Sequence, residues 1–434
     1  MNLMTESLWG DEAFSALAVM KSFPEMIGVV MRDTAPPLFY IVGYWWVRMF
    51  GFSEAALRSS TWLLMLGSAV FAGLIVFHLD KNKVGAILAG GLAFFSPFLF
   101  RFAFEWRMYA LLTFTVTAST YFFVTKRWGW YTVMALAALY THHFAVFTVF
   151  AQGLWFLVTD FSWKKRDRWW PELKPFLFIG LGYSLWLYPM YVQIQRVRGS
   201  GFWLSVPKIS DLSDLLWRFT TGGVAKNWQV MVGALGAVLV ITKDWKRVWK
   251  DWLGLVVIFS APVFLSFALS QVITPIFYDR YLLSAVAGVS VLLVLGTRKQ
   301  FLGLGVGVLL VYGFLSWNVF TNPQKRPFRE FAAFVKTQIQ PDDFLLNWNG
   351  KAHHIWETKY YGVPAPIYTP NGPLPLYVGT AQMTPEDTID KLPDKSRIGL
   401  IASENPRDIN LPGYKLTFVK QFGELRFMWW DKTR

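Results

Sequence analysis

Ten apolar runs recur between residues 57 and 318, and they restrict the possible folds of this chain more than any other feature. Eight of the ten runs have 16 to 22 residues, close to the roughly 20 that a helix needs to cross the hydrocarbon core of a bilayer. Only 16% of all residues are charged, whereas soluble domains have about 25%. The sequence therefore predicts a polytopic α-helical membrane protein, with spans near 57–78, 84–101, 108–125, 129–141, 143–160, 175–192, 229–242, 253–271, 281–296 and 301–318.

Charge and cysteine content exclude several classes of function. The net charge is +14, but no basic stripe follows a soluble fold. Cationic loops facing an anionic lipid leaflet account for the charge, so the bilayer is the expected partner and nucleic acid is not. The chain has no cysteine, which excludes disulfides and thiolate chemistry.

Lysine and arginine clusters orient the predicted spans, because cytoplasmic loops are enriched in these residues. The densest clusters lie at 164–168 and 243–250. Placing both clusters inside puts 102–107, 193–228 and the tail after Asn322 outside.

The N-terminal stretch is apolar but does not supply a further crossing. Pro36–Phe50 is short for a span, so we expect it to lie in the membrane interface, with residues 13–31 forming a surface helix. The chain then divides into an outer juxtamembrane loop at 1–56, a transmembrane helical domain at 57–320 and a soluble extracytoplasmic domain at 321–434.

The tail has the periodicities of a small α/β or α+β domain. Pro327–Ile339 places apolar residues at helical spacing. A short turn containing Gly423 predicts a hairpin between the last two strands. The expected strands are Asp343–Trp348, Arg397–Ile401, Tyr414–Val419 and Glu424–Trp430. Adjacent histidines point in different directions on a helix, so we expect His353 and His354 to be solvated rather than bound to a metal.

Ionisable and polar side chains gather on the predicted outer face, where burial in the membrane is costly and often marks function. Carboxylates can accept a hydroxyl proton, arginines can hold a phosphate, and apolar walls can hold a lipid tail. A lipid-phosphate substrate at the membrane surface would use all three. The set comprises Asp11, Glu12, Asp33, Arg58, Glu105, Arg107, Tyr109, His142, His143, Arg280 and Tyr281.

Each of these residues also has a purely structural interpretation. Asp11 and Glu12 can simply charge the first turn of a surface helix. Glu105 and Arg107 can pair at the end of a span, Arg280 can anchor at the interface, and the adjacent histidines can cap a broken helix. Their convergence on one predicted face favours a functional role over a structural one. No single residue does so by itself.

A series of motifs in fixed order carries a family resemblance. Trp9-Gly10-Asp11-Glu12 precedes Asp33 with Pro36-Pro37-Leu38, and then Gly51-Phe52-Ser53-Glu54-Ala55-Ala56-Leu57-Arg58. There follow Glu105-Trp106-Arg107-Met108-Tyr109-Ala110-Leu111, Tyr140-Thr141-His142, a loop with Gln193 and Trp203, and Phe277-Tyr278-Asp279-Arg280-Tyr281. Over residues 9–320 this order resembles the family 39 glycosyltransferases of the GT-C superfamily, which are relatives of protein O-mannosyltransferases and of the lipid A aminoarabinose transferase.

The resemblance implies an inverting glycosyltransferase of a prokaryotic plasma membrane. It would move a sugar from a polyprenyl-phosphate donor to a hydroxyl acceptor on a protein, lipid or glycan, at the outer face. The catalytic positions would be Asp11, as the base, and its neighbour Glu12. Donor-phosphate ligands would be Arg58, Arg107 and Arg280, and substrate-binding residues would be Asp33, Glu105, Tyr109, His142, His143 and Tyr281. No cofactor or obligatory metal is implied.

The sequence departs from the family pattern at two points. The family has a span before the Asp-Glu loop, so we expect either a start further upstream or a fold that tolerates its loss. Relatives often carry His or Lys where Ala35 precedes the Pro-Pro pair. Ala35 cannot contact a phosphate, so that contact must come from another residue.

Two other classes of function stay open. A flippase or transporter of lipid-linked glycans would also need arginines near a lipid phosphate, but it predicts internal repeats and polar groups near the bilayer midplane. A non-catalytic scaffold with a sensory tail predicts no need for Asp11 or Glu12.

Overall fold

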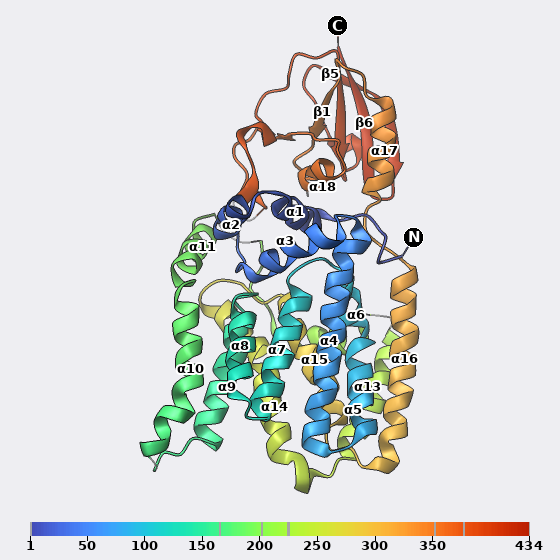
Figure 1. Cartoon of the computed structure of the whole chain (residues 1–434). Helices are drawn as coiled ribbons and strands as arrows, with labels where there is room; N and C mark the ends of the chain where they lie inside the picture. Colours follow the sequence, from blue (N-terminus) through green and yellow to red (C-terminus); the bar gives the residue numbers. More distant parts are fainter. Residues whose placement is uncertain are drawn as a thin grey trace.

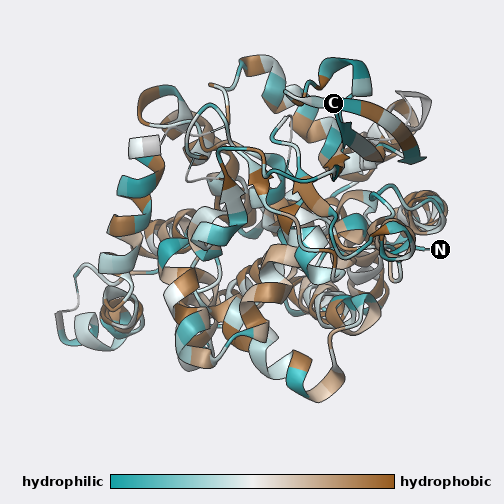
Figure 2. Cartoon of the chain, turned by 90° about the horizontal axis from the view of Figure 1, so that it is seen from above, coloured by the Kyte–Doolittle hydropathy of each residue, from teal (hydrophilic) through white to brown (hydrophobic). Residues whose placement is uncertain are grey.

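A bundle of helices carries a small mixed sheet at one end, and three short helices lie between the two (Figure 1). The computed structural model describes residues 2–164, 166–200, 203–223, 226–350, 353–375 and 378–433. Residue 165, in the first basic cluster, lies outside them. Seen from above, apolar segments recur along the helices of the bundle (Figure 2).

The bundle contains the ten predicted runs, each on one helix or one bent pair of helices. By length and composition, three helices are able to cross a membrane alone, or five spans if each bent pair counts as one. The three are α4 (Glu54–Asp80), α14 (Trp245–Val272) and α16 (Leu302–Thr321). The shorter apolar helices are α7 (Tyr109–Val124), α8 (Trp128–Leu139), α9 (Ala145–Thr159), α13 (Lys226–Ile241) and α15 (Leu283–Val294), and the more polar α12 (Ile209–Thr221) precedes α13.

Prolines account for the two bent pairs. The helices α5 (Lys83–Phe94) and α6 (Pro97–Ala103) meet at 62°, and α10 (Trp169–Ser184) and α11 (Leu187–Ser200) meet at 59°. Pro97 opens α6 and Pro189 lies in the first turn of α11. A proline has no N–H for the preceding turn and its ring clashes with the carbonyl four residues before it, so the helix restarts in a new direction.

The juxtamembrane segment forms three helices, α1 (Gly10–Met20), α2 (Phe23–Arg32) and α3 (Leu38–Phe50). The single surface helix expected at 13–31 is therefore wrong. Pro24 occupies the first turn of α2, and Ser22 and Glu25 close its start, with Ser22 Oγ donating to Glu25 Oε2 at 2.6 Å. Both are signals for a new helix. The helix α3 lies across the end of the bundle, as expected for Pro36–Phe50 (Figure 1).

The C-terminal domain, called the soluble domain after its predicted character, contains a six-stranded mixed sheet in the order β3-β2-β1-β4-β6-β5. The pairs β3-β2, β2-β1 and β1-β4 are parallel, and β6 runs antiparallel to β4 and β5. Gly423 has a φ of 60° in the turn between β5 and β6, which confirms the predicted hairpin. The strands are β1 (Phe344–Asn347), β2 (Ile367–Tyr368), β3 (Thr388–Ile389), β4 (Arg397–Ala402), β5 (Tyr414–Phe422) and β6 (Leu425–Lys432).

Two helices link the sheet to the rest of the chain. The predicted helix α17 (Phe328–Gln338) covers the sheet with its apolar face. The short α18 (Ile355–Tyr360) follows β1 and packs on α1, where the rings of Trp356 and Phe14 meet edge to face at 5.4 Å. His354 is buried, with 1% of its surface exposed, and bonds Ser403 Oγ at 2.7 Å. The expectation that His354 is solvated is therefore wrong.

Candidate active site between two cavities

Asp11 lies in the first turn of α1, at the end of the bundle that carries the soluble domain. Its side chain is 45% exposed, and its Oδ2 lies 3.3 Å from Arg280 Nη1. Arg280 comes from the loop before α15 and also lies 4.0 Å from Glu105 Oε1. The structure thus brings together a carboxylate open to solvent, a guanidinium group and a second carboxyl group from three distant segments.

Aromatic rings hold the Arg280 guanidinium group in place. It lies over the rings of Trp9 and Tyr278, at 4.9 and 5.0 Å from their centroids, and 6.0 Å from that of Tyr109. Such cation–π contacts stabilise a partly desolvated cation. Burial raises the pKa of Glu105 above its ordinary value, against the opposing charge of Arg280.

Arg107 approaches Asp11 from the opposite side. Its Nη1 donates to the Asp11 carbonyl at 3.2 Å and to Ser15 Oγ at 2.6 Å, which fixes the first turns of α1. Within the described part of the chain, the Nε–H of Arg107 and that of Arg280 are shielded from solvent and have no hydrogen-bond partner. Two buried cationic donors therefore lack acceptors beside Asp11.

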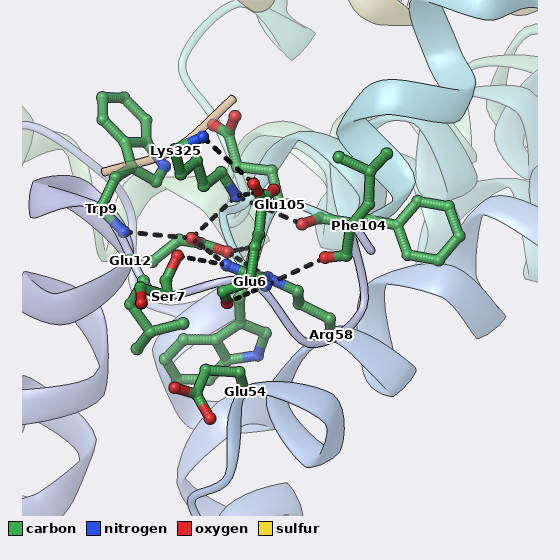
Figure 3. Close-up of polar contacts among 12 residues, drawn as sticks. Glu6, Ser7, Trp9, Glu12, Glu54, Arg58, Phe104, Glu105 and Lys325 are labelled. Atoms are coloured by element: carbon green, nitrogen blue, oxygen red, sulfur yellow. Dashed lines mark hydrogen bonds and ion pairs between the residues drawn. The ribbon is translucent and has the colours of Figure 1, made fainter. Parts of the chain in front are cut away.

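Glu12 occupies a different environment from its neighbour (Figure 3). It is fully buried, and its carboxylate accepts from the N–H of Trp106 at 2.8 Å and from Lys325 Nζ at 2.9 Å. Burial opposes its ionisation, but Lys325 and Arg58 outweigh this and lower the pKa of Glu12 to about 2. Because the Glu12 carboxylate is buried and bound by Arg58, Lys325 and the N–H of Trp106, the geometry favours a role in fixing α1, and the catalytic role of Glu12 stays a prediction.

Arg58 is the main partner of Glu12. Its side chain is fully buried at the start of α4, with Nη2 at 2.7 Å and Nε at 3.0 Å from the two oxygens of Glu12. The remaining donors reach the carbonyls of Leu3, Glu6 and Ser7. Because every donor is used inside the protein, the geometry favours a structural role for Arg58, and its predicted contact with the donor phosphate stays a prediction.

Asp33 lies in the loop after α2. Tyr40 of α3 donates its hydroxyl hydrogen to Asp33 Oδ2 at 3.2 Å. Burial raises the pKa of Asp33, against the charge of Arg107. Asp33 and Asp11 therefore both interact with the charge of Arg107.

The two adjacent histidines have separate roles. His142 Nδ1 accepts from the N–H of Phe144 at 3.2 Å, which leaves Nε2 to carry the ring proton, and burial lowers its pKa to about 3. His143 bonds Gln193 Oε1 at 3.0 Å and the Tyr183 hydroxyl at 3.2 Å. Gln193 in turn donates to the carbonyls of residues 30 and 35, so this network ties α11 to the juxtamembrane loop.

Two cavities are each lined in part by residues of this cluster. One, of about 400 Å³, is mostly apolar and lies between the loops and helices α9, α11 and α14. The other, of about 560 Å³, is polar and is bounded by α6, α12 and the end of α16. The apolar cavity is lined in part by Arg107, Tyr109, His142, His143, Gln193 and Tyr281, and the polar cavity by Glu6, Arg101, Glu105, Arg218, Arg280 and Lys325.

Asp11 lies between the cavities, because its carboxylate contacts Arg280 of the polar cavity and its carbonyl contacts Arg107 of the apolar one. Sequence reasoning did not assign roles to Trp9, Tyr278 or Lys325. The two aromatic residues stand within quoted motifs, but Lys325 is in a polar linker that has no local signal. In the ranges described, no group of three His, Asp or Glu side chains could hold a metal ion, and the need for a metal stays untested by this arrangement.

Comparison with solved structures identifies the architecture. ArnT from Cupriavidus metallidurans in the apo state matches with a TM-score of 0.55 at 12% identity, over 98% of this chain and 94% of that chain. The chain has the ArnT fold. ArnT from the same organism bound to undecaprenyl phosphate gives a TM-score of 0.52 at 12% identity, over 98% of this chain and 95% of the other. No family model and no curated protein sequence matches.

At 12% identity this similarity shows the fold alone, so the resemblance to the family 39 glycosyltransferases stays a prediction. The shared fold confirms the predicted fold class, a polytopic helical membrane protein with a small C-terminal α/β domain.

Proposed function

We propose that this protein is an inverting glycosyltransferase that takes a sugar from a polyprenyl-phosphate donor and passes it to a hydroxyl acceptor. The observation that carries the proposal is that Arg107 lines the apolar cavity and Arg280 lines the polar one, while both residues contact Asp11. A guanidinium group holds a phosphate by charge-assisted hydrogen bonds.

The two cavities suit the two substrates. The apolar walls of the 400 Å³ cavity match the first isoprene units of a polyprenyl chain, with Arg107 at the head of the cavity. The polar 560 Å³ cavity suits a hydroxylated acceptor. A solved protein of the same fold binds undecaprenyl phosphate, which is a polyprenyl phosphate, and this supports the proposed donor.

The reaction is a single displacement. Asp11 removes the proton from the acceptor hydroxyl as its oxygen bonds to the anomeric carbon of the sugar. The bond from that carbon to the phosphate oxygen breaks, and polyprenyl phosphate leaves with the electron pair, its charge held by Arg107 and Arg280. One displacement inverts the anomeric configuration and needs one base rather than the paired carboxylates of hydrolases.

Arg280 links donor binding to the freedom of the base. Its Nη1 lies 3.3 Å from Asp11 Oδ2. A phosphate that competes for the guanidinium group releases this oxygen of Asp11 toward the acceptor. Asp11 is then fully available as a base only when the leaving group is already bound.

Release of free polyprenyl phosphate tests the proposal. Purified protein in detergent receives radiolabelled polyprenyl-phosphate sugars with a membrane acceptor fraction, and Asp11→Asn is compared with Asp342→Asn as an exposed control. We expect wild type and the control to release the lipid, and Asp11→Asn to be at least about a hundredfold slower, because a general base contributes this factor or more. Full turnover by Asp11→Asn would remove its role as base. If wild type released no polyprenyl phosphate from any donor, the transferase proposal would be rejected and the alternative, a transporter of lipid-linked glycans, would be favoured.

The site and the soluble domain are proposed to face the outside of the cell. The chain has no cysteine, so one introduced thiol reports the side of the membrane without background. Lys420→Cys, on the exposed face of β5, should react with a membrane-impermeant maleimide in intact cells. Labelling only after the cells are broken would reverse the topology.

A further inference from the structure

The linker between α16 and α17 contributes Lys325 to a cluster of charged side chains next to α1 (Figure 3). The other members of the cluster are Glu6, Glu12 and Arg58. Lys325, in this linker, places Nζ 2.9 Å from Glu12 Oε2 and 3.5 Å from Glu6 Oε1. Its backbone N–H donates to Glu6 Oε2 at 3.2 Å. One linker residue therefore binds the N-terminal segment and α1 at the same time.

Lys325 completes a balanced group of charges. The carboxylates of Glu6 and Glu12 are both buried, with no more than 1% of either side chain exposed, and Arg58 and Lys325 are the cations that contact them. Arg58 forms its ion pair with Glu12 and reaches only the backbone carbonyl of Glu6. Without Lys325, Glu12 would pair with Arg58 alone, and the Glu6 carboxylate would lose the cation that contacts it among the described residues.

The position of Glu12 sets the direction of Asp11. Consecutive residues of an α-helix are about 100° apart around its axis. Because Glu12 is held inward by Arg58, Lys325 and the N–H of Trp106, Asp11 is turned toward Arg280 and the cavities. A loose Glu12 would allow the first turn of α1 to rotate or fray.

The soluble domain holds the same helix from above. Gln382 Nε2 donates to the Phe14 carbonyl at 2.8 Å, and the rings of Trp356 and Phe14 are in contact. The Tyr361 hydroxyl accepts from the N–H of Leu8 at 2.7 Å. These contacts reach α1 and the residues just before it, and Lys325 is the point where the chain passes from the bundle into this domain.

We propose that Lys325 is a positioning residue of the transfer reaction, through which the soluble domain fixes the Asp11 carboxylate in its reactive direction. The inference rests on the proposed function for its catalytic part. By this inference the soluble domain is needed for the reaction, although none of its strands contributes a residue to the two cavities.

The test compares Lys325→Met and Lys325→Arg with Arg326→Met. Arg326 is the next residue in the chain and is also a cation, but it pairs with the exposed Glu424 inside the soluble domain. For Lys325→Met we expect kcat to fall by about 10- to 100-fold, because a displacement of about 1 Å at a reacting group has this effect. The donor KM should change by less than about threefold, Lys325→Arg should recover most of kcat, and Arg326→Met should match wild type.

A double variant that restores the charge balance separates an effect on folding from an effect on the position of Asp11. Glu6→Gln with Lys325→Met removes one acid and one base, so the unfolding midpoint should return toward that of wild type while kcat stays low. Recovery of both midpoint and kcat would overturn positioning and leave only a charge-balance role for Lys325. An unchanged kcat in Lys325→Met would overturn it as well.

Amide hydrogen exchange tests the physical part without any donor. Exchange in the peptide covering residues 8–15 should be at least about tenfold faster in Lys325→Met than in Arg326→Met, because local opening follows the loss of tertiary contacts. Equal exchange would refute the inference even if the protein is a transferase. Faster exchange in a protein that releases no polyprenyl phosphate would uphold the contact and refute the proposed function.

Discussion

Replacing Arg58 with methionine tests how the site is held together. The Arg58 guanidinium group makes five hydrogen bonds, two to the Glu12 carboxylate and three to the carbonyls of Leu3, Glu6 and Ser7. All of them are shielded from water. Methionine fills similar space along the side chain but makes none of these bonds.

The magnitude follows from what Arg58→Met leaves behind. Removing one partner of a buried ion pair costs about 3–5 kcal/mol, and the contact of Lys325 with Glu12 holds this term near its lower end. The three carbonyls add roughly 1–3 kcal/mol together if water reaches part of them. The expected loss is about 4–6 kcal/mol. At about 2 °C per kcal/mol for a large unit, the unfolding midpoint falls by roughly 8–12 °C.

Tryptophan fluorescence in detergent can follow the unfolding, since the chain has 23 tryptophans. Arg58→Lys keeps the charge but loses the planar fork of donors, so it should recover less than half of the lost stability. The folded protein should keep the donor KM of wild type. If Arg58→Met unfolded at the wild-type midpoint and raised the donor KM instead, Arg58 would be a phosphate ligand after all and the structural assignment would be refuted.

Two further predictions concern the charges around Asp11. Folding lowers the pKa of Glu12 from 4.5 to about 2. The ionised carboxylate therefore contributes about 3 kcal/mol to the free energy of unfolding above pH 4.5, and this contribution is lost as the pH falls toward 2. Glu12→Gln should flatten the pH dependence of the unfolding midpoint between pH 4.5 and 2, and an unchanged slope would contradict the structural role of Glu12. Arg280→Met should raise the donor KM by about 10- to 100-fold, the value of a hydrogen bond to a charged group. A donor KM and a kcat that both match wild type would place the phosphate elsewhere.

The helices of the bundle could be predicted from sequence because apolar length is a local property. The breaks between helices were harder to predict. Pro97 and Pro24 are signals for a break, but one apolar run fits both a straight helix and a bent pair. The position of α3 at the end of the bundle agrees with the expectation that Pro36–Phe50 lies in the membrane interface and does not cross the bilayer.

The site could be predicted only in outline. Asp11 and Arg280 meet although 269 residues separate them, and the ordered motifs were enough to select both. The family resemblance gave Glu12 a catalytic position and Arg58 a contact with the donor phosphate. Their partners are each other, 46 residues apart, and three backbone carbonyls of a loop. No local pattern reveals such a pairing, and the same reason hid the burial of His354.

The orientation of the sheet has a consequence for how this protein can be divided. In open α/β sheets the edge at the carboxyl ends of the parallel strands is where ligands usually bind. Here that edge, between β1 and β4, leads into α18 and rests on α1. A fragment that begins after α16 would expose this edge, with Trp356 and Tyr361, to water. We therefore regard the soluble domain and the juxtamembrane helices as a single cooperative unit, to be expressed, crystallised or exchanged between proteins together.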